Sequence, residues 1–251
     1  MKRAARLTAI LDLLADQGEV SVDELVDGFD ASPATIRRDL DSLAEQRLLT
    51  RTHGGAVAQS VAYELPVRYK SHQRSEEKER IARAASALVS AGAVVGLSGG
   101  TTTTAIAAAL AARDGLGEFT VVTNAVNIAA QLATRPDIKV VVTGGVIHSR
   151  SYELVGPFVE QLLGGILLDI AFIGVNALSA EDGAATHDER EAAVNRLMAS
   201  RAVRAVAVAD SDKIGQKAFA HVGGAELFDT VITDAEAPEL TAAGYTVLVA
   251  E

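Results

Sequence analysis

The sequence contains no cysteine, and only five of its 251 residues are proline. Without cysteine, disulfide bonds, thiolate metal sites and a cysteine nucleophile are all excluded. There is also no low-complexity tract, and no apolar run resembles a signal peptide or is long enough to span a bilayer. We therefore expect a cytoplasmic protein that makes no contact with a membrane.

Basic residues are scarce as well. The chain has 23 lysines and arginines against 33 aspartates and glutamates, which gives a formal net charge of −10. Even in the first 57 residues the acidic side chains outnumber the basic ones. A chain with this charge repels nucleic acid overall, so any contact with DNA must be local. Apolar residues make up 49% of the chain, and its length allows two domains.

The stretch from Ser32 to Leu43 is typical of a short helix with one buried and one contacting face. Ser32 is a good N-cap, and proline follows at the first helical position, where a missing N–H costs nothing. The buried stripe is Ile36, Leu40 and Leu43. The opposite side carries Ala34, Thr35, Arg38 and Ser42, with Arg37 on its flank. Small residues allow close approach to a major groove, and arginines reach guanine edges or phosphates. Taken alone, the same pattern also fits a solvated amphipathic helix.

The neighbouring segments favour the DNA interpretation. Helices are predicted over residues 2–17 and 21–29, with a tight turn before the third helix, which is the helix-turn-helix arrangement. A hairpin follows, with strands at 48–51 and 56–57, and it predicts a wing whose tip meets phosphate or the minor groove. For His53 a structural role in the turn is an equal alternative. The residues predicted to contact DNA are Ser32, Ala34, Thr35, Arg37, Arg38, Arg51 and His53. We predict a winged helix-turn-helix domain over residues 1–57 and a linker over 58–74.

From residue 75 to residue 251 helices and strands alternate. The predicted helices are 75–91, 101–113, 125–133, 157–163, 188–200 and 238–243, and the predicted strands are 93–97, 119–123, 139–143, 170–173, 202–209, 230–233 and 246–250. The strands are continuously apolar, which indicates an α/β domain with a mostly parallel sheet covered on both faces.

The carboxyl ends of these strands, where such sheets bind ligands, carry glycine and hydrogen-bonding side chains. The residues concerned are Ser98, Gly99, Gly100, Thr101, Thr102 and Thr103 after the first strand, Thr123 and Asn124 after the second, Gly144 and Gly145 after the third, Asn176 after the fourth, and Asp210 and Lys213 after the fifth. Glycine lets backbone N–H groups approach an anion, and a helix N-terminus adds its positive end. Each loop alone fits a plain tight turn, but together they predict a site for a phosphorylated polyol.

Two segments carry a family resemblance. Residues 35–40 (Thr-Ile-Arg-Arg-Asp-Leu) together with residues 51–56 (Arg-Thr-His-Gly-Gly-Ala) resemble the DeoR family of bacterial transcriptional regulators. The second half is similar to the family's sensor domain, whose fold is shared with ribose-5-phosphate isomerase and glucosamine-6-phosphate deaminase. The matching positions there are Gly100–Thr103, Thr123, Asn124, Gly144, Gly145, Gly174, Gly183, Thr186, Glu191, Asp210, Lys213 and 232–234.

The resemblance implies a DNA-binding regulator, a repressor of carbohydrate-metabolism genes, that binds double-stranded operator DNA and senses a phosphorylated sugar. Paired half-sites on DNA require a homodimer or a higher homo-oligomer. Three positions depart from the family pattern: Arg47 and Ala177 stand where many members have glycine, and Ser98 where many have aspartate. The last departure affects the expected recognition of sugar hydroxyls.

The alternative is a sugar-phosphate isomerase or deaminase that carries a DNA-binding domain. The candidate acid–base residues are Asp182, His187, Asp188, Glu189 and Asp210. However, Asp188 also reads as a helix N-cap with Glu191 three positions later, which explains the acids without catalysis. The run from His187 to Glu189 lacks the spacing of a metal site. We therefore predict no enzyme activity, no metal and no cofactor. A purely structural protein would leave the donor-rich strand ends unexplained.

Overall fold

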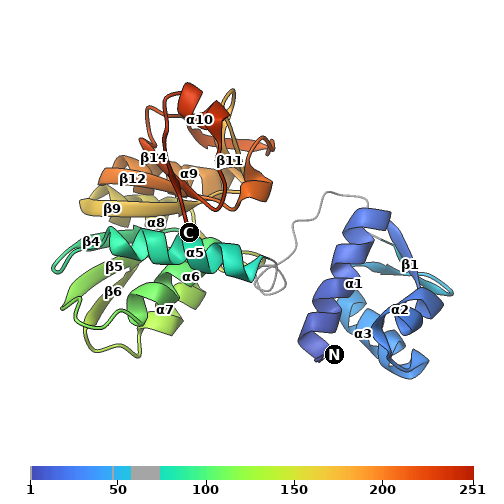
Figure 1. Ribbon diagram of the computed structural model, residues 1–251. Coiled ribbons are helices and arrows are strands. Elements are labelled where there is room, and N and C mark those ends of the chain that lie inside the picture. The colour runs from blue at the N-terminus through green and yellow to red at the C-terminus, as the bar shows by residue number, and fades with distance from the viewer. Residues whose placement is uncertain (1, 47, 58–73) are drawn as a thin grey trace. The chain divides into compact units, whose positions relative to one another are not determined.

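The structure is a computed structural model that describes residues 2–46, 48–57 and 74–251. Two compact units make up the chain, Met1–Gln73 and Arg74–Glu251, and each is described here by itself (Figure 1). Apart from Arg74, the predicted linker over 58–74 lies outside the described residues. Arg47, one of the departures from the family pattern, lies outside them too.

The N-terminal domain is a winged helix-turn-helix, as predicted. Its elements are α1 (Arg3–Gln17), β1 (Glu19–Ser21), α2 (Val22–Phe29), α3 (Pro33–Glu45), β2 (Thr50–Arg51) and β3 (Gly55–Val57). The three strands form one antiparallel sheet in the order β1-β3-β2. The apolar stripes of the three helices meet in a single core, to which α3 contributes Ile36, Leu40 and Leu43.

Local capping signals set where α2 and α3 begin. Ser21 Oγ accepts a hydrogen bond from Glu24 N at 3.1 Å, and Glu24 Oε2 accepts one from Ser21 N at 2.9 Å, which completes a capping box. Ser32 Oγ accepts from Thr35 N at 3.2 Å, directly before the proline that opens α3. Between the two helices Asp30 adopts the left-handed conformation, with φ of 48°.

A glycine in the wing is required by the close approach of β1. A Cβ atom on Gly55 would lie 1.9 Å from the carbonyl oxygen of Val20, so no side chain fits there. This contact ties the wing to the segment between α1 and α2. The pairing of β1 with the wing was not predicted from the sequence.

The C-terminal domain is built around a seven-stranded parallel sheet. Its helices are α5 (Ser75–Ala87), α6 (Thr101–Ala111), α7 (Val126–Leu132), α8 (Pro157–Gly164), α9 (Glu189–Ser200) and α10 (Pro238–Ala242). The sheet contains β4 (Val94–Leu97), β5 (Phe119–Thr123), β6 (Ile138–Val142), β9 (Leu168–Gly174), β12 (Ala202–Val208), β14 (Thr230–Thr233) and β15 (Thr246–Val249). The strand order is β15-β14-β12-β9-β4-β5-β6, so the direction of winding reverses between β4 and β9.

Helices cover both faces of this sheet, which confirms the α/β architecture. Along β9, Ile170 and Phe172 pack in the core beneath α5, α6 and α7, whereas Ala171 and Ile173 pack beneath α8, α9 and α10. Figure 1 shows the green helices α5, α6 and α7 grouped beside strands β4, β5 and β6.

Short strands outside the main sheet were not predicted. They are β7 (Val146–His148) and β8 (Glu153–Val155), which form a hairpin, and β10 (Ala177–Ser179), β11 (Gly183–Thr186) and β13 (Ala220–Gly223), which form a small antiparallel sheet. The prediction that the first helix of this domain continues to residue 91 was wrong. The helix ends at Ala87, because the following N–H groups of Leu88 and Val89 bond three residues back instead of four.

Candidate DNA-binding surface and effector site

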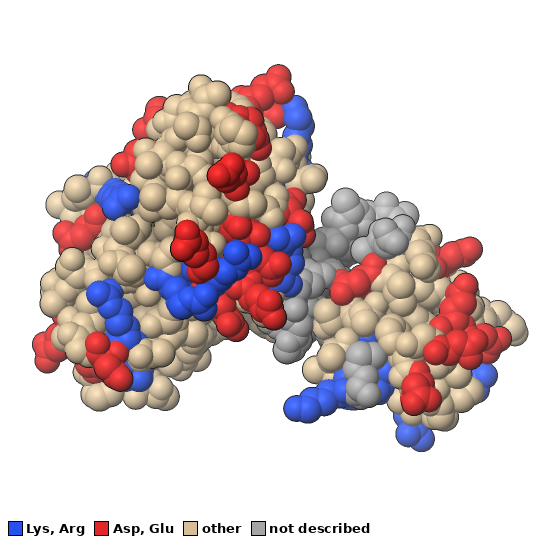
Figure 2. All heavy atoms as spheres, viewed as in Figure 1, with Lys and Arg blue, Asp and Glu red and all other residues tan. Residues whose placement is uncertain are grey.

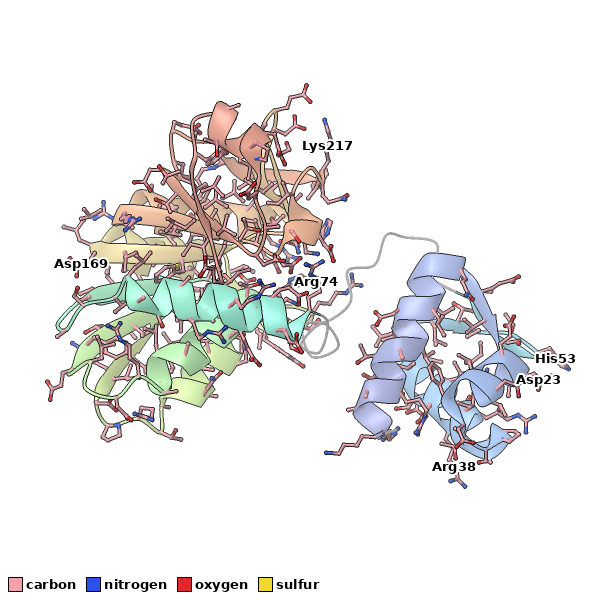
Figure 3. The ribbon with its side chains drawn as sticks, in the orientation of Figure 1. Asp23, Arg38, His53, Arg74, Asp169 and Lys217 are labelled. Atoms are coloured by element: carbon pink, nitrogen blue, oxygen red, sulfur yellow. The ribbon has the colours of Figure 1, made fainter. Side chains whose placement is uncertain are left out.

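The outward face of α3 is accessible. Ser32, Ala34, Arg37 and Arg38 are exposed, and Thr35 is half-buried. Neither arginine makes an ion pair or a side-chain hydrogen bond with another described residue, and Arg38 points away from the domain (Figure 3). The hydroxyl of Ser32 serves the helix as its cap and also lies 2.9 Å from Thr35 Oγ1. Their contacts with DNA stay predictions.

A buried ion pair fixes α3 against α1. Asp39 is 2% exposed; its Oδ2 lies 2.6 Å from Arg6 Nε, and its Oδ1 lies 3.2 Å from Arg3 Nε. The carboxylate is therefore neutralised inside the domain, whereas the neighbouring Arg38 is exposed. The acidic and basic side chains of the first 57 residues do not all lie on one surface. Their summed charge therefore does not describe the exposed face of α3.

Exposed acidic residues of this domain lie on several elements, including α3, where Asp41 and Glu45 are exposed. Figure 2 shows the red side chains gathered over α2 and β1, and blue ones along the lower edge of the domain. Asp23 and Glu24 stand in the first turn of α2, where a negative charge is favourable. Arg37 and Arg38 are thus exposed on α3 in spite of the net negative charge of the chain.

The two predicted wing residues differ in their surroundings. His53 is exposed (Figure 3). Arg51 is partly buried; its Nε donates to Asp41 Oδ1 at 2.9 Å, and its guanidinium also donates to the carbonyl oxygen of Gly55. Several of its donors are thus used within the domain.

In the C-terminal domain the loops after β4 and β9 meet at the point where the strand order reverses. Ser98 Oγ accepts a hydrogen bond from Gly174 N at 2.9 Å and donates to the carbonyl oxygen of Gly99 at 3.2 Å. A Cβ atom on Gly174 would lie 2.9 Å from that same oxygen. Ser98 is fully buried, and its hydroxyl joins the two strand ends. The position where relatives carry aspartate therefore has a structural role here.

The loop after β4 opens α6 without a side-chain cap. Gly100 is the N-cap residue, with φ of 125°, a conformation that favours glycine. The hydroxyls of Thr103 and Thr104 both donate to its carbonyl oxygen, at 3.1 and 2.6 Å. Among the described residues no side chain accepts from the first N–H groups of α6. This turn is the one that the sequence predicted as a cradle for an anion.

The β7–β8 hairpin forms a wall beside this turn. Asn124, at the end of β5, donates through Nδ2 to Glu153 Oε2 at 2.9 Å and to the carbonyl oxygen of Leu154 at 3.3 Å. The Glu153 side chain packs directly on Gly99, where the atoms of its carboxyl end would lie 2.3–2.4 Å from a Cβ. Both Asn124 and Glu153 are buried. The carboxylate of Glu153 therefore lies against Gly99 of the predicted anion-binding loop.

The acidic segment before α9 is accounted for by structural contacts. Asp188 caps α9 by accepting hydrogen bonds from Arg190 N and Glu191 N at 2.9 and 3.2 Å. A side-chain hydrogen bond from Arg190 holds the pKa of Asp188 below its ordinary value. Glu191 turns instead to His148, whose Nδ1 lies 2.6 Å from its Oε1. The predicted cap at Asp188 is confirmed.

The other predicted effector residues lie along the same edge of the sheet. Thr123 Oγ1 accepts from Ala125 N at 3.0 Å, Asn176 Oδ1 accepts from His187 N at 3.3 Å, and Gly144 and Gly145 have positive φ. Asp210 is buried, and its carbonyl oxygen accepts from Lys213 N at 2.9 Å. In the described part of the chain no hydrogen bond or ion pair joins Lys213 to the loop after β4. Because β9 lies between β4 and β12, the axes of β4 and β12 are about 10 Å apart.

Two family models match this chain. The DeoR-like helix-turn-helix domain matches residues 6–61, and the DeoR C terminal sensor domain matches residues 73–235. This chain belongs to the DeoR family. The family consists of DNA-binding transcriptional regulators, which agrees with the resemblance found in the sequence.

Curated relatives match this DeoR-family chain along nearly its whole length. The HTH-type transcriptional regulator GlpR of Haloferax volcanii is 38% identical over 99% of this chain and 98% of its own. The glycerol-3-phosphate regulon repressor of Escherichia coli is 34% identical over 95% of this chain and 93% of its own. A ribose 5-phosphate isomerase from Methanocaldococcus jannaschii aligns at 19% identity, with a TM-score of 0.44, over 58% of this chain and 56% of that one.

Sequence reasoning missed several polar residues at the sensor edge of this DeoR-family protein. Glu153 and His148 belong to the unpredicted hairpin, and Asn195 lies on α9, where Nδ2 donates to the carbonyl oxygen of Gly174 at 3.4 Å. For Asn195 one signal was present: it follows Glu191 by four positions, so the two polar groups share a face of the helix.

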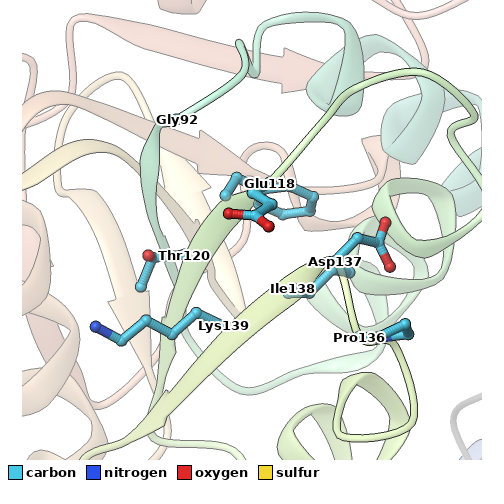
Figure 4. Close-up of a pocket in the computed structure, with 8 residues that line it drawn as sticks. Gly92, Glu118, Thr120, Pro136, Asp137, Ile138 and Lys139 are labelled. Atoms are coloured by element: carbon cyan, nitrogen blue, oxygen red, sulfur yellow. The ribbon is translucent and has the colours of Figure 1, made fainter.

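A hollow at the opposite edge contains none of the predicted residues. It has a volume of about 360 Å³ and is bordered by Glu118, Thr120, Asp137 and Lys139 at the amino ends of β5 and β6 (Figure 4). Its charged groups carry both signs and reach into solvent. Ligands of parallel sheets bind at the carboxyl ends of the strands, so this hollow does not coincide with the predicted effector site.

Two general features complete the description of the site. Within the described ranges no group of three His, Asp or Glu side chains is placed to hold a metal ion. No described helix is both long enough and apolar enough to span a bilayer.

Proposed function

We propose that this DeoR-family protein represses carbohydrate-metabolism genes, and that a phosphorylated sugar controls its binding to operator DNA. The observation that carries the proposal is the pairing of two surfaces. One domain presents the unpaired guanidinium groups of Arg37 and Arg38 on an exposed helix. The other presents an uncapped helix N-terminus at the reversal point of a parallel sheet. The Escherichia coli relative is a glycerol-3-phosphate regulon repressor, which supports a phosphorylated effector.

In the proposed complex the effector's phosphate lies against the first turn of α6. Gly100 to Thr103 supply backbone N–H groups there, and the positive end of the helix favours an anion. Lys213 makes the second cationic contact. The separation of about 10 Å between β4 and β12 is bridged by a long lysine side chain together with a ligand of sugar-phosphate size.

Arg74 connects the loop that carries Lys213 to α5, the first helix of the C-terminal domain. It is the N-cap of α5, with φ of 49°, and it donates to Asp212 and to Ser211 Oγ, the latter at 2.9 Å. It also donates to Asp234 Oδ2 at 2.9 Å. Effector binding at Lys213 would move the neighbouring Asp212 and thus act on the point where the chain leaves for the DNA-binding domain (Figure 3).

Two-fold pairing of the chain belongs to the same proposal. A single α3 reads one half-site, and paired half-sites one helical turn apart mirror the symmetry of a protein dimer. We therefore propose that the DNA-binding form is a homodimer or a higher homo-oligomer. A change in the placement of the paired DNA-binding domains would weaken operator binding when the effector binds.

No catalytic turnover is part of this function. Asp188 is used as a cap, and Asp182 pairs with Lys217 at 2.7 Å, so neither has the free carboxylate that proton abstraction needs. The relatives are named as regulators. We expect no conversion of ribose 5-phosphate or glucosamine 6-phosphate. A rate that Asp210→Asn abolishes would favour the isomerase alternative instead.

The test is a titration of the Lys213→Ala variant. Lysine–phosphate contacts contribute roughly 1.5–3 kcal/mol, so effector affinity should fall by about one to two orders of magnitude. Operator affinity without effector should not change. Lys139→Ala, at the opposite edge of the sheet, is the matched control and should leave both affinities unchanged. If an unphosphorylated sugar bound the wild-type protein as tightly as its phosphate ester, the proposed phosphate site would be wrong.

A further inference from the structure

Buried oxygen atoms at the sensor edge are left without a hydrogen-bond donor. Asn124 Oδ1, Asn195 Oδ1 and Asp210 Oδ1 are each buried and have no partner among the described residues. Asn124 is fully buried, and Asn195 is 2% exposed. An unsatisfied buried acceptor costs about 1–3 kcal/mol, and native proteins keep few of them. Their concentration along one edge of the sheet therefore needs an explanation.

The orientation of the Asn124 amide is fixed by its surroundings. Its Nδ2 donates to Glu153 Oε2 at 2.9 Å and to the carbonyl oxygen of Leu154 at 3.3 Å. Both of these partners are acceptors, so the nitrogen must face them and the oxygen must face the other way. Asn124 thus presents an acceptor that no described group uses.

Asn195 presents a second acceptor at the same edge. Its Nδ2 donates to the carbonyl oxygen of Gly174 at 3.4 Å, which directs Oδ1 away from β9. Gly174 in turn bonds to Ser98 and packs on Gly99, and Gly99 packs on Glu153. A continuous set of contacts therefore runs from Asn195 across the strand ends to Asn124.

A phosphate group does not satisfy these atoms. Phosphate oxygens are mainly acceptors, and the Glu153 carboxylate in the same layer repels an anion. Hydroxyl groups donate, and a polyol carries several of them. The phosphate of the effector and its hydroxyl groups would then lie against different parts of the edge.

We infer that Asn195 and Asn124 bind hydroxyl groups of the effector through their side-chain oxygens, which makes Asn195 a specificity-determining residue of this site. The inference rests on the proposed function. Within that function, different residues recognise the phosphate and the hydroxyl groups of the ligand. The first turn of α6 binds the phosphate. The amide layer from β5 and α9 distinguishes a phosphorylated polyol from phosphate alone.

The experiment compares Asn195→Leu with Asn195→Asp by calorimetric titration of the full chain. The probes are inorganic phosphate, glycerol 3-phosphate, ribose 5-phosphate and glucosamine 6-phosphate. Leucine has a similar volume but no acceptor, so the best-bound sugar phosphate should bind about tenfold more weakly. Affinity for inorganic phosphate should not change. Aspartate keeps an acceptor in place but loses the donor to Gly174 and adds a negative charge, so it should bind the sugar phosphate more tightly than Asn195→Leu and more weakly than the wild type.

Thermal unfolding without ligand supplies a second readout. Asn195→Leu removes a buried unsatisfied oxygen and also the 3.4 Å hydrogen bond to Gly174, so the two effects oppose each other and its midpoint should stay close to that of the wild type. A purely structural role, through the bond to Gly174, predicts instead a lower midpoint for both variants and equal losses for every probe. That result, or unchanged sugar-phosphate affinity in Asn195→Leu, would overturn the inference. If the wild type bound none of the phosphorylated probes, the proposed function itself would fail.

Discussion

The two domains place the polar groups of their candidate sites in opposite ways. On the N-terminal domain Arg37, Arg38 and His53 reach into solvent. In the C-terminal domain Ser98 and Asn124 are fully buried at the strand ends. The first arrangement suits a large polyanion, which approaches a surface and is met by long, flexible side chains. The second suits a small ligand, which is enclosed and recognised atom by atom.

The comparison also separates two uses of buried polar groups. In the N-terminal domain the buried carboxylate of Asp39 is paired by Arg3 and Arg6 and serves the fold. In the C-terminal domain Asn124 and Asn195 keep oxygen atoms without described partners. Satisfied groups of the first kind fix an element in place, whereas unsatisfied groups of the second kind indicate a ligand.

The largest expected effect comes from removing the buried carboxylate of the N-terminal domain. In Asp39→Ala the Arg6 guanidinium, whose side chain is 11% exposed, loses this partner inside the domain. Breaking a buried pair costs about 3–5 kcal/mol. Calorimetry of the full chain should show a lower transition for the N-terminal domain and an unchanged one for the C-terminal domain.

Asp41→Ala is the matched control for that measurement. Asp41 pairs with Arg51 but is 61% exposed, so its loss should change stability by less than about 1 kcal/mol. Equal losses of stability in Asp39→Ala and Asp41→Ala would contradict the difference that we expect between buried and exposed carboxylates in this domain.

The second prediction concerns the exposed arginines. Arg38→Ala should cost roughly 1–3 kcal/mol of specific operator binding, since it removes a group predicted to read base edges. Arg51→Ala should weaken operator and random DNA about equally, because its predicted contact is with phosphate. Quantitative footprinting on both kinds of DNA measures the difference. Unchanged operator affinity in Arg38→Ala would remove the assignment of α3 as the recognition helix.

The last prediction is an acid-dependent loss of stability in the C-terminal domain. Burial alone would raise the pKa of Asp234, but hydrogen bonds from Ser211 and the charge of Arg74 outweigh it and hold the pKa below the ordinary value of 3.8. The carboxylate therefore stabilises the fold above that pH, and its contribution is lost as the pH falls through the folded-state value.

Thermal unfolding between pH 6 and pH 3 tests this prediction. Asp234→Asn should lower the midpoint at pH 6 by an amount equivalent to about 1–3 kcal/mol, from the lost charged hydrogen bonds. Near pH 3 the difference from the wild type should shrink. A difference that stayed constant over the whole range would show that the charge of Asp234 contributes nothing.

Much of the fold could be predicted because its signals are local. Ser21, Ser32 and Asp188 each cap a helix within the first turn that follows, so α2, α3 and α9 began within one residue of the predicted position. The strands of the main sheet are apolar and follow helices in regular alternation. The short strands have no such signal. β11, with the sequence Gly-Ala-Ala-Thr, has no alternation of apolar and polar residues, and only its pairing with β10 and β13 makes it a strand.

The site was predicted only in part, for a related physical reason. The glycine turn at Gly99 and Gly100 is visible in the sequence, since glycine before a helix permits an uncapped start. The layer that faces this turn depends on contacts between distant segments. Glu153 meets Asn124 across 29 residues, and Asn195 meets Gly174 across 21. Nothing local distinguishes Glu153 from an ordinary surface residue, and for Asn195 the local signal is limited to its four-residue spacing from Glu191.

The place of β9 in the sheet has a consequence for the order of folding. β9 pairs with β4, and this pairing brings together Val95 and Ile170, which are far apart in the sequence. In the N-terminal domain the pairing of β1 with β3 joins Glu19 to Val57, which are closer in the sequence. Closing distant pairs slows folding. We expect two phases in stopped-flow refolding, the faster from the N-terminal domain, and a single shared phase would contradict this. During synthesis on the ribosome the DNA-binding domain is complete before β9 has been made. The N-terminal domain should therefore fold before the C-terminal domain.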